Sequence, residues 1–284
     1  MWNLRAEDCA GLASYDEQSI ELSRRVINAR ELGGYVSTEG RRIKYGKLIR
    51  TGQLSRADDD DLRILSERYK VGTVIDLRSD FELAGQEDPS VDGAEYHNLQ
   101  VPEFDLTDGE KERLNAVNAE KERGKRVMML VEEGMYADTE AYKRIMFGDQ
   151  AEKAYRRFFE LLLSNDGEHS VLFHCTKGKD RTGIGAAMTM ALLDFSEKMI
   201  MADYMMSNIA NAHLILSDLD AVSVHTDDKS IADKVWSVNG VRSERLNTVF
   251  SIAEDECGSV KEFVKRRYGL SDKDILDLKN IYLE

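Results

Sequence analysis

The spacing of hydrophobic residues changes along the chain: some segments show the pattern of strands and others that of helices. The sequence therefore predicts a mixture of the two. Short apolar runs rich in β-branched residues predict strands that are buried in a sheet. Glycine-containing turns divide residues 26–55 into strand, turn and strand. The predicted strands lie within 26–55 and at 71–80, 95–101 and 170–175.

Helical spacing recurs between these strands. Leu62, Leu65 and Tyr69 form one apolar stripe with acidic residues ahead of it, which is typical of an amphipathic helix. Residues 81–86 allow no more than a short helix. The longer predicted helices lie at 58–69, 151–163 and 182–195. Strands alternating with helices predict an α/β fold of three layers, a central sheet of four or five strands flanked by helices.

Two long stretches are predicted to be mostly helical. Residues 105–150 are charged and rich in methionine, and we interpret them as a helical insertion. Its flexible methionines suit a lid over a site, and ordinary helix packing explains them equally well. Residues 196–284 are also mostly helical. Near the end, Gly269 stops one helix and Ser271 caps the next, with Asp274 at its third position.

Composition narrows the classes of function. The chain has 284 residues and only two prolines, so we expect one domain spanning 1–284 without a linker. A net charge of −14 disfavours binding to nucleic acid, which needs cations to neutralise phosphates. No run approaches the roughly 18 apolar residues of a membrane span, so stable membrane insertion is not expected.

The cysteines and the first residues predict a compartment. Cys9, Cys175 and Cys257 are widely spaced, which disfavours a disulfide framework or a zinc site. The N-terminus lacks the apolar core of a signal peptide. We therefore expect a cytoplasmic protein without a metal or another cofactor, and its oligomeric state stays open.

The loop that follows the predicted strand 170–175 contains the candidate catalytic residues. The predicted strand 170–175 ends in Cys175, and the loop to the next helix, TKGKDR, is basic although the chain is acidic. A helix N-terminus and a tight glycine loop turn backbone N–H groups toward an anion. The same surroundings lower the pKa of a thiol from ~8.5 to about 3.5–7.5. Cys175 is therefore a candidate nucleophile that attacks phosphorus.

The other residues of this loop suit a tetrahedral oxyanion. Arg181 can hold two of its oxygens in a fork. Gly178 and Gly183 allow close approach, and Thr182 can hydrogen-bond the sulfur. The loop does not fit the nucleotide-binding GxxxxGK[ST] pattern, since Asp180 follows Lys179. The candidate substrate-binding residues are Thr176, Lys177, Gly178, Lys179, Thr182 and Gly183.

The motif HCTKGKDRTG resembles the HC-x5-R-[ST] signature of the cysteine-dependent phosphatases. Further blocks are similar to the atypical bacterial tyrosine phosphatases, which have dual or triple specificity and in part act on phosphoinositides. These blocks are NARELGGY at 28–35, GKLIRTG at 46–52, Leu54-Ser55, IDLRS at 75–79, Ala202-Asp203-Tyr204, Ser207-Asn208 and YGLS at 268–271. The resemblance covers nearly the whole chain and implies a cysteine-phosphatase-like fold. It is weakest over 105–150.

Several carboxyl groups compete for the role of proton donor to the leaving group. Asp180 ranks first because it lies in the loop, where the family resemblance also places an aspartate. Asp76 ends a predicted strand and can instead anchor Arg78 or the loop. Glu103 and Asp105 follow another strand and suit an acid that moves.

Other side chains are assigned around the site. His174 is expected to be a buried hydrogen-bonding residue that tunes the thiolate, and Arg30 and Arg78 belong to the wall of the site. Lys179, together with Lys177, favours substrates with more than one phosphate, such as phosphoinositides, although lysines near an anion site can also be merely solvated.

These observations predict a phosphomonoester hydrolase that needs no metal. Its substrates would be phosphotyrosine proteins, with phosphoserine and phosphothreonine as extensions, or phosphoinositides. The alternative is a non-catalytic module that binds phosphoproteins or phosphoinositides. Cys175, Arg181 and Thr182 are all present, which favours catalysis. Sulfur transfer is disfavoured by loop length, and arsenate reduction by the lack of a nearby second cysteine.

Overall fold

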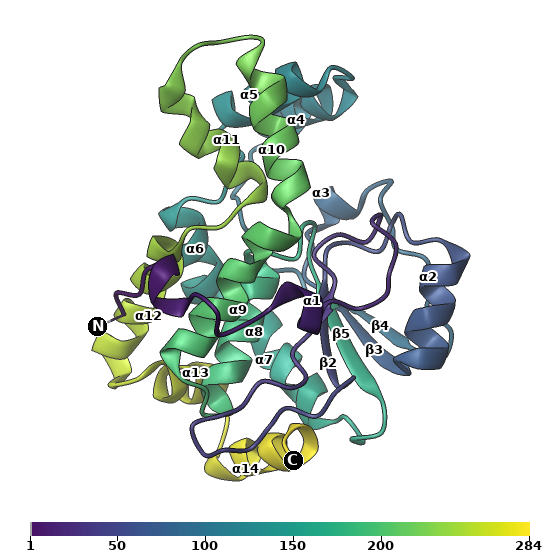
Figure 1. Ribbon diagram of the computed structural model, residues 1–284, viewed down its shortest axis with the longest axis vertical. Helices are drawn as coiled ribbons and strands as arrows, with labels where there is room; N and C mark the ends of the chain where they lie inside the picture. The colour runs from purple at the N-terminus through teal and green to yellow at the C-terminus, as the bar shows by residue number, and fades with distance from the viewer. Residues whose placement is uncertain (1) are drawn as a thin grey trace.

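The computed structural model describes residues 2–284 and contains a central sheet with helices on both faces (Figure 1). The strand order is β1-β2-β5-β3-β4, with β1 antiparallel to β2 and the other neighbours parallel. The strands are β1 (Arg30–Glu31), β2 (Leu48–Thr51), β3 (Val71–Asp76), β4 (Glu95–Asn98) and β5 (Ser170–His174). The predicted α/β class and its five-stranded sheet are confirmed.

Helices make up most of the remaining chain. Those of the first half are η1 (Ala6–Cys9), α1 (Tyr15–Gln18), α2 (Asp59–Arg63), the π-helical turn η2 (Ile64–Arg68), α3 (Asp80–Leu83), α4 (Asp108–Ala119), α5 (Arg123–Glu132) and α6 (Thr139–Phe147). Those of the second half are α7 (Asp149–Leu163), α8 (Arg181–Leu192), α9 (Glu197–Ala210), α10 (Ala212–Ser223), η3 (Lys229–Ile231), α11 (Ala232–Asn239), α12 (Ser243–Cys257), α13 (Val260–Tyr268) and α14 (Asp272–Tyr282).

Strands buried on both faces divide the interior into two main cores. On β5, Phe173 joins the core beneath α7 and α8, whereas its neighbour Leu172 joins the core beneath η2. The same alternation places Ile75 of β3 in the first core and Val74 in the second. Continuous apolar strands are what a parallel sheet covered by helices requires.

The predicted elements are present, and their ends differ for local reasons. The strand predicted at 71–80 stops at Asp76 because its carboxylate accepts a hydrogen bond from the N–H of Arg78, which forms a turn. Ser79 and Glu82 then form the capping box that starts α3. At the C-terminus, Gly269 ends α13 in the left-handed conformation and Ser271 caps α14, as predicted.

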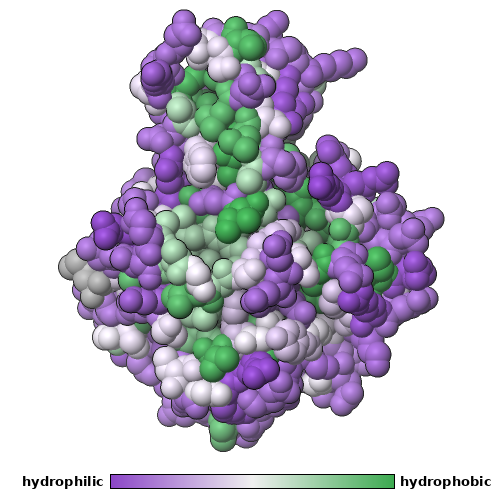
Figure 2. Space-filling model, in the orientation of Figure 1, coloured by the Kyte–Doolittle hydropathy of each residue, from purple (hydrophilic) through white to green (hydrophobic). Residues whose placement is uncertain are grey.

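Four helices project from the body as a separate lobe: α4, α5, α10 and α11 (Figure 1). Residues 105–150 are thus helical, as predicted, but α10 and α11, which come from later in the chain, complete the lobe. Val127, Val222 and Val235 form its own small core. Figure 2 shows hydrophobic residues gathered along α9 and α10, where Ile209 and Leu216 are exposed.

The parallel strands end at one edge of the sheet. Thr51 of β2 and Asp76 of β3 both pair with His174 of β5, and Asn98 of β4 pairs with Asp76. The segments that follow these strands therefore meet beyond their carboxyl ends, where open α/β folds bind ligands. Among residues 2–284, no helix is long and apolar enough to cross a membrane.

Candidate active site

The cysteine loop connects the end of β5 to the start of α8. Cys175 follows His174 directly and is 2% exposed, and α8 begins at Arg181. The N-terminus of α8 therefore directs its unpaired N–H groups and positive dipole end at the loop. The structure thus brings Cys175 and Arg181 to one end of the same helix, as the motif predicts.

Side chains outside the cysteine loop donate hydrogen bonds to two of its backbone carbonyl oxygens. The side-chain amide of Asn28 donates to the carbonyl oxygens of Lys177 (3.2 Å) and Gly178 (2.8 Å). Arg50 also donates to the Gly178 carbonyl at 2.8 Å. In a trans peptide the N–H points opposite to the C=O. Carbonyls that face outward therefore turn the next N–H groups toward the interior of the loop.

No residue type other than glycine fits at position 178 of the loop without strain. The φ of Gly178 is 63°, in the left-handed region, and a Cβ there would collide with the backbone of Thr51. Gly183 is less restricted, since a Cβ would meet the Tyr204 ring at 3.2 Å. The first glycine shapes the loop, and the second brings α8 close to its neighbour.

A buried charge cluster fixes the side chain of Arg50, which binds the loop carbonyl of Gly178. Asp203 of α9 forms ion pairs with Arg30 and Arg50, and all three side chains are inaccessible to solvent. Burial lowers the pKa of Arg50 to about 10, and it would raise that of Asp203 if the two arginines did not lower it. Because a buried charge without a partner is destabilising, the cluster fixes the position of Arg50.

The guanidinium of Arg181 binds a protein partner through its two terminal nitrogens, and its Nε–H lacks an acceptor among the described residues. Its two terminal nitrogens each lie 2.6 Å from an oxygen of Glu82. Burial would lower the pKa of Arg181, but Glu82 and the Cys175 sulfur raise it well above its ordinary value. Among residues 2–284, neither its buried Nε nor the buried hydroxyl of Thr182 has a hydrogen-bond partner. A buried donor without a partner is costly, so both atoms are suited to a ligand or to the sulfur.

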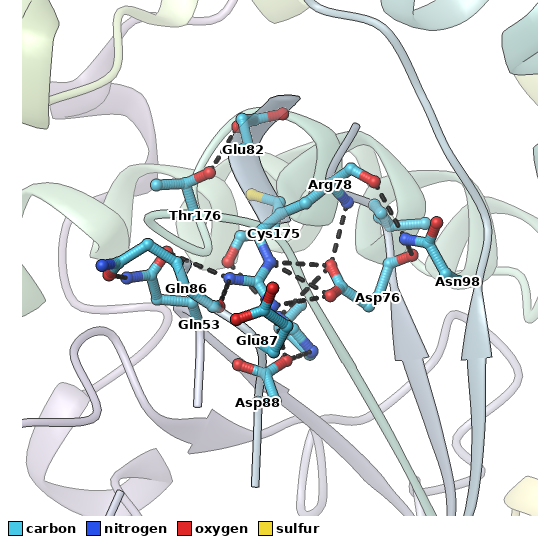
Figure 3. A network of polar contacts seen from close by, with 12 residues as sticks. Gln53, Asp76, Arg78, Glu82, Gln86, Glu87, Asp88, Asn98, Cys175 and Thr176 are labelled. Atoms are coloured by element: carbon cyan, nitrogen blue, oxygen red, sulfur yellow. Dashed lines mark hydrogen bonds and ion pairs between the residues drawn. The ribbon is translucent and has the colours of Figure 1, made fainter. Parts of the chain in front are cut away.

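Glu82 is a residue that the sequence interpretation missed. It accepts hydrogen bonds from Arg181 and Ser79 and from Thr176, as Figure 3 shows. Burial acts to raise the pKa of Glu82, but Arg181 lowers that pKa to about 2. The pattern Ser79-x-x-Glu82 indicates a helix start. It contains no sign that the glutamate reaches an arginine far along the chain.

Asp180 is tied to its surroundings through both carboxylate oxygens. One accepts a hydrogen bond from the Tyr142 hydroxyl of α6 at 2.6 Å, and the other lies 2.8 Å from the Lys179 ammonium. The Tyr142 hydroxyl also lies 2.5 Å from that of Tyr204. The helical insertion thus touches the loop through α6.

Both loop lysines reach helix α11. The Lys179 ammonium donates to the carbonyl oxygens of Ser237 and Gly240, and Lys177 donates to that of Val238 at 2.6 Å. Lys179 is buried. Burial lowers the pKa of Lys177 to about 8. These cations therefore bind the end of a helix as well as lying beside the loop.

Of the two carboxyls that follow β4, one reaches the site. A Glu103 oxygen lies 3.3 Å from Arg181, and its side chain is 11% exposed. Burial, followed by the nearby Asp180, raises the pKa of Glu103 to about 7. Asp105 is exposed.

Asp76, Asp88 and His174 form a polar cluster below the loop (Figure 3). Their ligand atoms lie within 4.8 Å of one another, which is a spacing that a metal could use. However, one terminal nitrogen of Arg78 lies 2.7 Å from each carboxylate. Since this guanidinium already bridges both carboxylates, we interpret the cluster as an ion-pair network that supports the strand end.

Comparison with known proteins points to one class. The tyrosine phosphatase family matches residues 22–284. A Cupriavidus necator protein named "Putative tyrosine-protein phosphatase" is 30% identical over 187 residues, which span 66% of this chain and 62% of that protein. The triple specificity protein phosphatase PtpB of Mycobacterium tuberculosis is 26% identical over 259 residues, 85% of this chain and 92% of PtpB.

A solved structure is more distant. It is a cysteine-to-serine variant of TpbA from P. aeruginosa in complex with phosphotyrosine, 13% identical to this chain, with a TM-score of 0.30. The match covers 73% of this chain and 93% of that one, and its TM-score is too low to bear on the site.

Proposed function

The chain belongs to the tyrosine phosphatase family and is an enzyme of the protein-tyrosine and dual-specificity phosphatase kind, and we propose that it hydrolyses phosphotyrosine in proteins through a cysteinyl-phosphate on Cys175. The observation that carries this proposal is the buried, unpartnered Nε of Arg181 at the N-terminus of α8, in the same loop as Cys175. A phosphoryl oxygen would satisfy that donor.

The proposed reaction has two steps. The Cys175 thiolate attacks phosphorus in line, forming an S–P bond while the bond to the tyrosine oxygen breaks. The loop N–H groups and Arg181 stabilise the charge on the equatorial oxygens. Water then attacks the cysteinyl-phosphate and releases inorganic phosphate, and Thr182 stabilises the departing thiolate. A carboxyl group beside Arg181 supplies the first proton, and the two in place are Asp180 and Glu103.

Two further assignments accompany this proposal. Residues 105–150 would act as a lid, which is supported by the contact of Tyr142 with the loop aspartate. The cytoplasm would be the compartment in which the thiol stays reduced, and this remains a prediction from cysteine usage.

We expect the purified chain to release phosphate from a phosphotyrosine peptide in the presence of EDTA, because the proposed mechanism uses only side chains and backbone N–H groups. Orthovanadate should inhibit it, since this ion adopts the geometry of the transition state. Phosphate release can be measured by a colorimetric assay. Binding of the phosphopeptide without any phosphate release would instead favour the non-catalytic module.

Replacing Lys179 with alanine tests the second substrate class, the phosphoinositides. Because the Lys179 ammonium is buried against the carbonyls of α11 and against Asp180, we expect kcat/KM to fall for both a phosphotyrosine peptide and a phosphatidylinositol phosphate. The ratio of the two kcat/KM values should change by less than about threefold. That corresponds to less than about 1 kcal/mol, whereas a hydrogen bond to a charged group is worth about 1.5–3 kcal/mol. Lys198→Ala, at an exposed position, is the matched control.

A selective loss on the lipid would mean that Lys179 leaves α11 to bind a second phosphate. That outcome would restore the phosphoinositide interpretation of the loop lysines. Equal losses on both substrates would make Lys179 a structural link between the loop and α11.

A further inference from the structure

Three carboxyl groups lie around Arg181 and Lys179, which are the two cations that form ion pairs with them among residues 2–284. Glu82 forms a two-pronged ion pair with Arg181, and Asp180 pairs with Lys179 at 2.8 Å. Glu103 is the third, at 3.3 Å from Arg181. Once the first two pairs are made, a charge on Glu103 is the least compensated of the three.

Asp180 has both of its carboxylate oxygens in contact with neighbouring side chains. Its two carboxylate oxygens already face a hydroxyl donor on Tyr142 and an ammonium on Lys179, and its side chain is 4% exposed. With both oxygens in contact with these partners, Asp180 links the loop to α6.

Glu103 has the opposite surroundings. Among residues 2–284, no hydrogen bond to its side-chain oxygens is found, and its contact with Arg181 is longer than either contact of Glu82. Its backbone carbonyl is held by Arg144 of α6 at 3.1 Å, which fixes the segment after β4 over the site. The carboxyl thus lies beside the guanidinium, and its oxygens accept no hydrogen bond from the described residues.

We propose that Glu103 is the catalytic acid, which protonates the leaving oxygen of the substrate, and that Asp180 is a positioning residue. This assignment rests on the proposed phosphatase function. As the Cys175 sulfur bonds to phosphorus, the Glu103 proton passes to the tyrosine oxygen and leaves a neutral phenol. In the second step, the Glu103 carboxylate takes a proton from the attacking water, and Cys175 departs as the thiolate.

Electrostatics agree with the geometry. Burial is the main cause that raises the pKa of Glu103 to about 7, and the negative Asp180 and Glu82 act in the same direction. Arg181 and Lys179 oppose them. Lys177, which also interacts with Glu103, is the remaining charge facing it. Since an acid must be protonated to act, activity should fall as pH rises through about 7.

The test is a comparison of two leaving groups in Glu103→Gln. We expect kcat/KM for phenyl phosphate, which reports formation of the phosphoenzyme, to fall by about 10²-fold or more, because its phenol has a pKa near ~10 and needs the proton. For dinitrophenyl phosphate, whose phenolate leaves without a proton, we expect a loss of less than about tenfold. The loss of activity above neutral pH should also disappear from the pH profile of kcat/KM.

Asp180→Asn is the comparison variant. Because it weakens the links to Tyr142 and Lys179, we expect similar losses on both substrates and an unchanged basic limb of the pH profile. The assignment is overturned if Asp180→Asn removes the basic limb and Glu103→Gln retains it. If Glu103→Gln does not fold, Glu103→Asp decides: a shifted basic limb supports Glu103 as the acid, and an unshifted one overturns it.

The same measurements separate this inference from the function beneath it. Wild-type protein that forms no phosphoenzyme in acid-quenched samples would refute the proposed phosphatase mechanism. Wild-type protein that forms one, together with a Glu103→Gln variant that treats both leaving groups alike, would refute only the role of Glu103.

Discussion

Replacing Cys175 with serine is expected to lower kcat for a phosphotyrosine peptide by at least about 10⁴-fold, as loss of a nucleophile does in other covalent enzymes. The thiolate is the nucleophilic form of cysteine, whereas an alcohol stays protonated at neutral pH and is a much weaker nucleophile without a general base. The substitution barely changes the size of the side chain. Binding of the phosphopeptide, measured by calorimetry, should therefore survive.

The other cysteines provide the control. Cys257 is partly buried at the end of α12, and Cys9 is buried in η1, and both thiols are free. Cys257→Ser should retain wild-type kcat. Mass spectrometry of acid-quenched wild-type protein should locate phosphate on Cys175. Turnover that survives in Cys175→Ser would remove the covalent mechanism.

The centre of the site could be predicted because it is local in sequence. Cys175 and Arg181 lie in one loop between a strand and a helix, so their spacing alone brings them together. The apolar run that ends at His174 places this loop at the carboxyl edge of a sheet. Such features need no knowledge of distant contacts, and the structure contains them as predicted.

The residues that support the loop could not be placed in this way. Asn28 and Arg50 lie 150 and 128 residues from the carbonyl of Gly178 that they bind. Their blocks resemble those of the family, but the resemblance does not say which atoms meet. The partner of Arg181, Glu82, is 99 residues away. Long-range ion pairs depend on how the helices pack, and charge alone is ambiguous in a sequence with many carboxylates.

The loop lysines illustrate the same limit. A cluster of cations beside an anion site is naturally interpreted as ligand binding, and spacing cannot distinguish this from helix capping. In the structure, Lys177 and Lys179 bind carbonyl oxygens at the end of α11, where cations stabilise the negative end of the helix dipole. The projecting lobe is therefore connected to the loop through charges that the sequence interpretation assigned to substrate.

Replacing Arg181 with lysine is the second large effect that we expect. Lysine keeps the positive charge but loses the planar fork, so it can hold Glu82 or a phosphoryl oxygen but not both in the same geometry. Two charge-assisted hydrogen bonds are worth about 1.5–3 kcal/mol each, so kcat/KM should fall by about 10² to 10⁴-fold. Steady-state kinetics with a phosphotyrosine peptide measures this loss.

The binding data distinguish this variant from the nucleophile variant. Cys175→Ser should still bind the phosphopeptide because its fork is intact, whereas Arg181→Lys should lose affinity for phosphopeptide and orthovanadate together. Arg157→Lys, at an exposed position of α7, is the control for the chemical change itself. If Arg181→Lys keeps its affinity and kcat/KM within about threefold, less than 1 kcal/mol, the fork does not grip the phosphoryl group and Nε faces no ligand.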